Sequence, residues 1–584
     1  MDYLDKQYTE QKHQKHIIMH DDKVKHKLGV DTELDNLEKY LASGLDRQDE
    51  IRNFHVVLVS LYSFSSFALH ILGPLLKSKG FKVSYIFFKD YIMDNQDLPT
   101  EEEYSLLMNL LADLKPNLIG LNVYSTYAPV AREVTKRAKT FGVPILWGGS
   151  HARDAADDSI KTADIVCSNE GEFPILKLAH ALATKQNYHD IKSLWFNDNG
   201  KTIKNDMYPL LQNLDLLPLP EFDDDDKYAI EYNQLTYGEP YYNSDLSWYN
   251  FMTGRGCPYK CTFCSNSHLN RKYKGLGSIL RRRTVDNVIE ELSMVKSRFP
   301  KLSCVSANDE VFVLQRDWLV EFCEKYKKEI NIPFHCDIYP TRITEDSMSL
   351  LHSMNTRTVS LGIQSGSERV RRDVYKRKTS DELLVNAANI IKKYNIYPSY
   401  DFIFDNPFEE EEDLVASLNF IAKMPRPFRI NTYSMQNHPS TDLTKRMLSE
   451  GIISERDLDG YSLKGFDNWH IDLKHYDKAS QFYHMYALFK IYSFSFAIIM
   501  PYFNRRYSVY PSWFLRFLIK NRLTLKKYTI FLTILLFFGK NADLLGRFLS
   551  MVLCGKWKRI YRKIFNEMKV KKYSIENNQV PCPK

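Results

Sequence analysis

Three cysteines lie within eight positions in the segment GRGCPYKCTFCSN, residues 254–266. They are Cys257, Cys261 and Cys264, spaced C-x₃-C-x₂-C, and no fourth cysteine follows nearby. Zinc sites usually complete a tetrahedron with ligands arranged as two pairs, so three thiols in one loop fit zinc poorly. An iron–sulfur cluster uses one thiolate per iron, so three thiolates on a four-iron cluster leave one iron open. The spacing therefore predicts metal ligation by all three cysteines.

The remaining cysteines favour the same interpretation. The chain has nine cysteines in all, an odd number with uneven spacing, and its first residues, MDYLDKQYTEQKHQKH, contain no apolar signal core. These features predict a cytoplasmic chain with reduced thiols rather than disulfide bonds. Cys304, Cys323 and Cys336 fall inside predicted strands or helices and are expected to be small core residues.

Length and composition predict a folded protein of several domains. A chain of 584 residues is too long for one hydrophobic core and predicts roughly two to four domains. Its 44% hydrophobic and 26% charged residues are those of an ordinary globular protein. We expect a polar extension over residues 1–50, followed by an α/β protein.

The first domain, residues 51–195, alternates short apolar runs with amphipathic helical stretches. This pattern predicts a doubly wound, Rossmann-like parallel sheet with helices on both faces. The predicted strands are His55–Ser60, Lys82–Phe88, Asn117–Val123, Val143–Gly149 and Ala163–Cys167. A ligand of such a sheet lies beyond the carboxyl ends of the strands. The candidate residues there are Ser125, Thr126, Gly148, Gly149, Ser150, Glu170, Gly171 and Glu172.

A second region of alternating strands and helices, residues 246–445, predicts a partial barrel. Residues 196–245, including LDLLPLPEFDDDDKY, have the composition of a linker. Residues 246–445 then contain six strand–helix units, too few for an eight-fold barrel but enough for a partial (β/α)₆ barrel of the TIM type. Active groups in a parallel barrel gather at the carboxyl ends of its strands. The cysteine loop follows the first strand, Asp309 and Glu310 the second, and Gln364 to Ser367 the fourth, so these groups are expected at one mouth.

The carboxyl-terminal region, residues 446–584, is expected to be mostly helical. Residues 501–570 contain fifteen Lys or Arg and two acidic residues, whereas the net charge of the whole chain is only +7. The longest apolar run there, Tyr528 to Phe538, is eleven residues, and a membrane-spanning helix needs about 20. Two alternatives stay open: helices packed on the rest of the protein, and peripheral contact with an anionic membrane. Nucleic-acid binding is not expected, because long apolar stretches interrupt the basic residues.

The cysteine loop, with Phe263 before its last cysteine, resembles that of the radical S-adenosylmethionine (radical SAM) superfamily. In that family the open iron binds the amino and carboxylate groups of SAM. The segments SANDEVF, LGIQSGSERV and DFIFDNPF resemble the family's SAM-binding motifs after the second, fourth and fifth strands. The resemblance implies SAM contacts by Phe263, Asp309, Glu310, Gln364, Ser365, Ser367 and Ile403. Among these residues, Glu310 is the expected acceptor for the amino group of SAM. Outside this list, Lys376 or Arg372 is a candidate to bind the carboxylate of SAM.

The first domain is similar to the cobalamin-binding domain that precedes the barrel in one large radical SAM group, the class B methyltransferases. The segment GGSHARDAADDSIKTADIVCSNEGEFPI carries this likeness. It implies cobalamin contacts by Ser125, Thr126, Gly148, Gly149, Ser150, Glu170 and Gly171. The D-x-H-x-x-G motif that sends a histidine to cobalt is absent, and His70 lies inside a predicted helix. Cobalt coordination without histidine is therefore expected.

The resemblance implies a reaction with a [4Fe–4S] cluster, SAM and cobalamin as cofactors. A 5′-deoxyadenosyl radical would activate a carbon of a small-molecule or lipid-like substrate, and methyl-cobalamin would methylate it. An external electron donor of the flavodoxin or ferredoxin type is implied. The alternatives are a cyclisation or rearrangement without methyl transfer, and a cobalamin or redox sensor that is not an enzyme. The sequence identifies no substrate acid or base.

Overall fold

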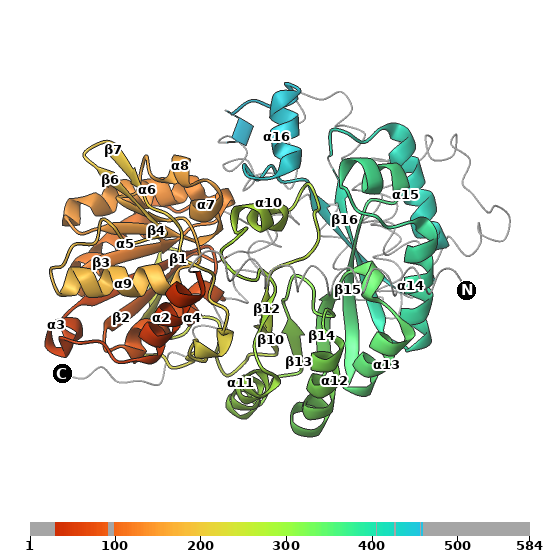
Figure 1. Cartoon of the computed structure of the whole chain (residues 1–584), viewed down its shortest axis with the longest axis horizontal. Coiled ribbons are helices and arrows are strands. Elements are labelled where there is room, and N and C mark those ends of the chain that lie inside the picture. The colour runs from red at the N-terminus through yellow and green to blue at the C-terminus, as the bar shows by residue number, and fades with distance from the viewer. Residues whose placement is uncertain (1–29, 91–97, 405, 426–427, 456, 459–584) are drawn as a thin grey trace, which may run out of the picture. The chain divides into compact units, whose positions relative to one another are not determined.

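The amino-terminal part of the chain is built on a nine-stranded sheet (Figure 1). The computed structural model describes residues 30–90, 98–404, 406–425, 428–455 and 457–458. The sheet order is β7-β6-β5-β4-β3-β1-β2-β8-β9, parallel from β5 to β8 with antiparallel strands at both edges. The strands are β1 (His55–Leu61), β2 (Lys82–Phe88), β3 (Leu118–Asn122), β4 (Ile145–Gly148), β5 (Ile165–Cys167), β6 (Leu194–Asp198), β7 (Lys201–Lys204), β8 (Lys227–Glu231) and β9 (Gln234–Tyr237).

Helices cover both faces of this sheet, which confirms the doubly wound architecture. Side chains alternate along each strand, so Val56 and Leu58 of β1 enter one core whereas Val57 and Val59 enter the other. Helices α4 (Phe67–Ser78) and α9 (Glu172–Ala183) contribute to the first core, and α5 (Glu101–Leu114) and α6 (Ala128–Ala138) to the second. The continuous apolar runs of the strands follow from this burial on both sides.

The structure differs from the expected domain boundaries at both ends of this sheet. Residues 196–245, expected to be a linker, contain β8 and β9, because Ala229 and Ile230 are buried in the two cores. Helix α2 (Val30–Ala42) belongs to the expected polar extension, yet its Leu37 and Leu41 pack into the first core.

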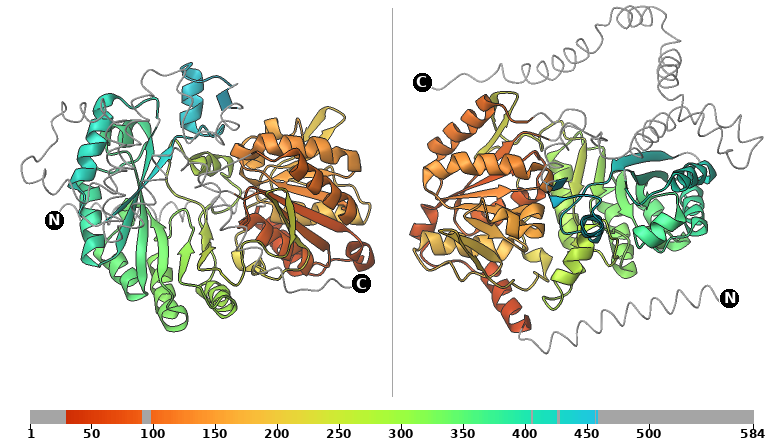
Figure 2. Two further views of the ribbon diagram at one scale, coloured as in Figure 1. Left: turned by 180° about the vertical axis from the view of Figure 1, so that it is seen from behind. Right: turned by 90° about the horizontal axis from the view of Figure 1, so that it is seen from above.

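Residues 246–445 form the expected six-stranded parallel sheet with order β10-β13-β14-β15-β16-β17. Its strands are β10 (Trp248–Phe251), β13 (Cys304–Ala307), β14 (Phe334–Ile338), β15 (Thr356–Gln364), β16 (Tyr397–Phe404) and β17 (Arg429–Ser434). The helices that connect them are α11 (Val285–Arg298), α12 (Arg316–Lys325), α13 (Glu345–Ser353), α14 (Asp381–Lys393) and α15 (Glu411–Lys423). Figures 1 and 2 show these helices on the outer side of the curved sheet.

The two faces of the barrel sheet differ in polarity. On β14, Phe334, Cys336 and Ile338 are buried, whereas the alternate residues His335 and Asp337 are half-buried and exposed. The helices therefore cover an apolar outer face, and the inner face is polar.

The carboxyl-terminal part of the chain is described only to the short region after α16 (Asp442–Ser449). The basic segment 501–570 lies outside the described residues, so its role stays a prediction. Within the described ranges, every helix is too short or too polar to cross a membrane.

Candidate functional site

The three cysteines lie in a loop that the fold holds at both ends. The loop follows the short strand β11 (Gly254–Arg255), which pairs with β12 (Arg281–Arg282), and it ends at α10 (Ser265–Lys272). Gly256 has φ +94°, and a Cβ there would lie 2.2 Å from the carbonyl oxygen of Ile279. Only glycine fits this turn, which directs the chain into Cys257.

Residues from distant segments of the chain hold the cysteine loop in place. The rings of Tyr259 and Tyr339 stack with centroids 3.4 Å apart. The Thr262 hydroxyl donates to the carbonyl of Val374 over 2.6 Å. The Arg377 guanidinium donates to the Sγ of Cys261 over 3.5 Å and lies 4.4 Å from the centre of the Tyr339 ring.

The donor set fits an iron–sulfur cluster better than a single metal ion. Cys257, Cys261 and Cys264 are all free thiols. In the parts of the chain that the structure describes, His, Cys, Asp and Glu side chains form no group of three that could hold one metal ion. A cluster needs one thiolate per iron, so its ligands need not converge on one point. Burial raises the pKa of the Cys257 thiol to about 12, so ligation of this thiolate requires the positive charge of bound iron.

Glu310 and Asp309, the two acidic residues expected to contact SAM, have different environments. The Glu310 carboxylate is solvent-accessible and close enough to Cys257 and Cys264 to contribute to the raised pKa of both thiols. Asp309 is buried, accepts hydrogen bonds from the backbone nitrogens of Thr253 (2.6 Å) and Gly254 (3.3 Å), and pairs with Arg282 at 3.0 Å. The carboxylate of Asp309 therefore holds the start of the cysteine loop, and Glu310 is the acidic group that faces the cysteines.

The residues expected to bind SAM after β15 already have partners within the protein. Ser365 donates to Glu409 over 2.8 Å, and Ser367 donates to Asp413 over 2.6 Å. Gln364 lies at the end of β15 with φ +73°, beside an irregularity in the pairing with β16. A non-glycine residue in this conformation carries strain, which is common at functional sites.

Phe263 and Ile403 pack against one apolar cluster, and the Phe263 ring lies 4.9 Å from that of Tyr375. The structure thus brings the expected SAM residues to the same end of the barrel sheet. Their contacts with SAM stay predictions.

A cavity of about 390 Å³ lies at the carboxyl end of the amino-terminal sheet. Its walls are mostly apolar, and they include Met252, Gly254 and Arg255 from the start of the cysteine loop. Its size and lining are those of an organic ligand site.

Five of the seven residues expected to contact cobalamin line this cavity: Gly148, Gly149, Ser150, Glu170 and Gly171. Gly149 has φ +90°, and a Cβ there would lie 2.8 Å from the backbone of Val123. The other two residues, Ser125 and Thr126, do not line it, and Ser125 shares a 3.2 Å hydrogen bond with His151. The contacts themselves stay predictions.

His70 of α4 also lines the cavity, and its Nε2 is a buried atom without a hydrogen-bond partner. Burial, helped by the charge of Lys227, lowers the pKa of His70 to about 3, so the ring is neutral. The cavity thus combines apolar walls, glycines and an orphaned polar atom, which fits a large organic cofactor such as cobalamin.

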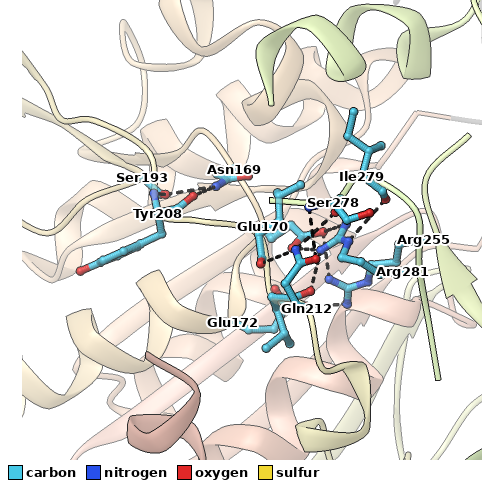
Figure 3. Close-up of polar contacts among 12 residues, drawn as sticks. Asn169, Glu170, Glu172, Ser193, Tyr208, Gln212, Arg255, Ser278, Ile279 and Arg281 are labelled. Carbon is cyan, nitrogen blue, oxygen red and sulfur yellow. Dashed lines mark hydrogen bonds and ion pairs between the residues drawn. The ribbon is translucent and has the colours of Figure 1, made fainter. Parts of the chain in front are cut away.

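Two glutamates at the rim of the cavity pair with two arginines of the paired strands β11 and β12 (Figure 3). Arg281 binds both carboxylate oxygens of Glu170 at 2.7 Å. Arg255 contacts Glu170 at 3.2 Å and Glu172 at 2.5 Å. Burial opposes the charge of Glu170, but the guanidiniums of Arg281 and Arg255 outweigh it and lower the pKa of Glu170 to about 2. We call Glu170, Glu172, Arg255 and Arg281 the rim cluster.

Helix α10, at the other end of the cysteine loop, also contacts the cavity region. The Lys272 ammonium donates to the carbonyls of Arg153 (2.7 Å) and Ser168 (2.8 Å). Burial lowers the pKa of Lys272 to about 8. The cysteine loop is therefore tied to the cavity both before Cys257 and after Cys264.

Sequence reasoning did not single out Arg255 or Arg377. Lys376 and Arg372, its candidates for the SAM carboxylate, are both exposed, and Arg372 pairs with its neighbour Asp373. Arg377 is the buried cation beside the cysteines. Within the local sequence YKRK, residues 375–378, three adjacent basic residues have equal chemistry, and the backbone takes a left-handed turn at Lys376, φ +54°, directly before the buried Arg377.

Comparison with known proteins agrees with this geometry. Residues 251–421 match the model of the Radical SAM superfamily. An uncharacterized methyltransferase of Pyrococcus horikoshii, PH0819, is 24% identical over 357 residues, covering 60% of this chain and 73% of the relative. The anaerobic magnesium-protoporphyrin IX monomethyl ester cyclase of Rubrivivax gelatinosus is 23% identical over 316 residues, 52% of this chain and 54% of that enzyme. The chain thus spans about half the length of the cyclase.

Two solved structures share the fold. The cobalamin-dependent SAM radical enzyme OxsB, with aqua-cobalamin and SAM bound, matches with TM-score 0.55 and 15% identity, covering 91% of this chain and 82% of OxsB. The radical SAM methyltransferase TsrM of Kitasatospora setae, with cobalamin and a [4Fe–4S] cluster bound, matches with TM-score 0.54 and 16% identity, covering 68% of this chain and 78% of TsrM. Residues 251–421 therefore form a radical SAM domain, and this domain implies a [4Fe–4S] cluster and SAM.

Proposed function

We propose that this radical SAM enzyme uses its cluster together with SAM and cobalamin to methylate an unactivated carbon of a small-molecule substrate. The observation that carries the proposal is the direct attachment of the cysteine loop to the cavity rim, through Arg255 to Glu170 and Glu172. Methyl transfer of this kind needs its two cofactor sites side by side.

When bound, the cluster, SAM and cobalamin supply hydrogen-atom abstraction and a methyl donor. The chain supplies position and charge. Cys257, Cys261 and Cys264 hold the cluster, and the Arg377 guanidinium offsets the negative charge of the Cys261 thiolate. Glu310 accepts hydrogen bonds from the SAM amino group, and the apolar walls of the cavity exclude water around the second cofactor.

The inner face of the barrel sheet favours a polar substrate over a lipid-like one. His335 is hydrogen-bonded to Thr358 over 2.7 Å and lies 3.6 Å from the Asp337 carboxylate. Asn431 donates to Asp401 over 2.9 Å. Polar side chains therefore come from β14, β15, β16 and β17, and they offer hydrogen bonds and negative charge to a small molecule.

The test is anaerobic reconstitution of the full chain with iron, sulfide and hydroxocobalamin, followed by reduction and incubation with SAM. We expect bound cobalamin and the product 5′-deoxyadenosine. Cys261→Ala should lose that product, and the matched control Cys336→Ala, a buried cysteine of β14, should keep it. A protein that binds the cluster but neither cleaves SAM nor retains cobalamin would support the sensor hypothesis instead.

A second candidate is cyclisation or rearrangement without methyl transfer, which the cyclase relative favours. The two reactions differ in the products of SAM. Methylation yields S-adenosylhomocysteine beside 5′-deoxyadenosine, whereas cyclisation yields 5′-deoxyadenosine alone. Quantifying both products with candidate small molecules, in the presence of a flavodoxin- or ferredoxin-type donor, separates the two functions.

A further inference from the structure

We propose that Arg255 is a positioning residue that couples the cavity to the cysteine loop, so that a ligand in the cavity and the cluster stabilise each other's binding. The inference rests on the proposed function, because it takes cobalamin as the ligand of the cavity. Its physical basis is the rim cluster, which connects the two sites through direct contacts.

The first step is the position of Arg255 in the chain. It lies two residues before Cys257, and Gly256 between them occupies a turn that no other residue fits. Pairing of β11 with β12 fixes the backbone of Arg255 on its other side. A displacement of the Arg255 guanidinium should therefore also displace the backbone at Cys257.

The second step is that Arg281 and Arg255 have different partners within the rim cluster. Arg281 binds Glu170 with two equal hydrogen bonds and donates a third, of 2.9 Å, to the carbonyl of Leu211. Arg281 can therefore hold strands β11 and β12 to the cavity rim without Arg255. The Arg255 guanidinium bridges Glu170 and Glu172, and both carboxylates belong to the turn that lines the cavity. The two contacts of Arg255 therefore depend on the relative position of Glu170 and Glu172.

The third step is the location of Glu172 and Gly171. Glu172 is the first residue of α9, where a carboxylate is favoured by the helix dipole. Gly171, a cavity-lining residue, lies between the two glutamates. A ligand that packs against Gly171 therefore restricts both partners of Arg255 at once.

The fourth step connects Arg255 to the SAM side of the site. The positive charge of the Arg255 guanidinium acts on the Glu310 carboxylate. The same guanidinium is thus felt by the cavity rim and by the acidic group expected to bind SAM. Glu170 and Glu172 hold the Arg255 guanidinium in place. A ligand that orders these two glutamates therefore also fixes the electrostatic field of Arg255 at Glu310.

Coupling between two sites is reciprocal, so it can be measured from binding alone. The experiment uses full-length reconstituted protein and follows release of iron to a chelator with and without hydroxocobalamin. In wild type we expect hydroxocobalamin to slow iron release about fivefold, the lower end of typical coupling. Reciprocity also requires that the affinity for hydroxocobalamin be higher with the cluster than in the Cys257→Ala/Cys261→Ala/Cys264→Ala variant.

The variants Arg255→Lys and Glu172→Gln test the bridge. Lysine keeps the charge of Arg255 but lacks the planar fork that spans two carboxylates, and glutamine keeps the shape of the Glu172 side chain without its charge. At hydroxocobalamin concentrations that saturate each variant, the ligand should no longer slow iron release. The matched control is Arg316→Lys, because Arg316 forms an exposed pair with Asp346 through two 2.9 Å hydrogen bonds.

Two results would overturn the inference and spare the proposed function. In one, wild type binds hydroxocobalamin but releases iron at an unchanged rate. In the other, Arg255→Lys and Glu172→Gln both keep the full effect. Absence of hydroxocobalamin binding to folded wild type would instead refute the cobalamin proposal, and the inference with it. Circular dichroism of each variant separates loss of coupling from loss of folding.

Discussion

The Arg377 guanidinium donates a hydrogen bond to the Sγ of Cys261 over 3.5 Å, across 116 residues of sequence. Its other terminal nitrogen donates to the carbonyl of Gly362 over 2.6 Å, which fixes the guanidinium beside the thiol. Hydrogen bonds and positive charges at cysteine ligands favour the reduced state of an iron–sulfur cluster.

We therefore predict that Arg377→Gln lowers the reduction potential of the cluster by tens of millivolts. Arg377→Lys, which keeps a positive charge, should lower it less. The measurement is a redox titration of the reconstituted cluster followed by electron paramagnetic resonance. Arg372→Gln, a change at an exposed arginine five residues earlier, should leave the potential unchanged. A higher potential in Arg377→Gln would contradict the prediction.

Substitution of Asp309 should lower the stability of the protein, whereas substitution of Glu310 should lower its affinity for SAM. Asp309→Asn leaves Arg282 buried without its charged partner, so we expect a loss of roughly 3 kcal/mol in the free energy of unfolding. Glu310→Gln changes a solvent-accessible group, so its free energy of unfolding should stay within about 0.5 kcal/mol of wild type. Urea unfolding of each variant measures these values.

Calorimetric titration with SAM completes that comparison. Glu310→Gln should weaken binding of SAM, because it replaces the charged acceptor of the amino group. Wild-type affinity in Glu310→Gln would contradict the role of Glu310, and wild-type stability in Asp309→Asn would contradict the role of Asp309.

The neutral ring of His70 should make the protein sensitive to acid. Burial and the nearby Lys227 lower the pKa of His70 to about 3 in the folded protein, whereas the unfolded chain has the ordinary value near 6.5. The unfolded state therefore binds more protons between these values, and stability falls as pH drops from 6.5 toward 3. At pH 5 the loss amounts to about 2 kcal/mol relative to neutral pH.

His70→Gln should remove this part of the acid sensitivity. The measurement is the melting temperature between pH 5 and 7.5 for wild type and variant. His189→Gln, at an exposed histidine, serves as the control and should follow wild type. Parallel curves for wild type and His70→Gln would show that His70 does not contribute.

Asp401 should have the opposite pH dependence. Burial raises the pKa of Asp401 to about 6, and the charge of Asp337 adds to the rise, although the hydrogen bond from Asn431 opposes it. The folded protein then binds more protons than the unfolded chain between pH 4 and 6, so this group destabilises the fold as pH rises through 6.

Asp401→Asn should accordingly be more stable than wild type by about 3 kcal/mol at pH 8 and nearly equal to it at pH 4. Chemical denaturation at the two pH values measures the difference. Asp198→Asn, at an exposed position of β6, is the control, since it should show the same stability at both pH values as wild type. A variant less stable than wild type at pH 8 would contradict the prediction.

The sequence by itself determined the architecture and the choice of the three cysteines as the proposed cluster ligands. Alternation of short apolar strands with amphipathic helices is a local pattern, and it predicted β2 at its observed bounds and β1 to within one residue. The three cysteines are also local, because one loop of eight residues contains them all. Strands β8 and β9 escaped prediction, since the prolines and aspartates around them indicate a linker. Their hydrogen bonds depend on tertiary pairing, because β8 adds to β2 and β9 adds to β8.

Only the tertiary structure decided which charged groups complete the site. Arg255 and Glu172 are 83 residues apart and Arg377 and Cys261 are 116 apart, and no periodicity connects them. The sequence shows many arginines and glutamates of equal chemistry. Which of them pair depends on the packing of separate elements, because a salt bridge requires atoms within about 4 Å and burial makes its partner specific.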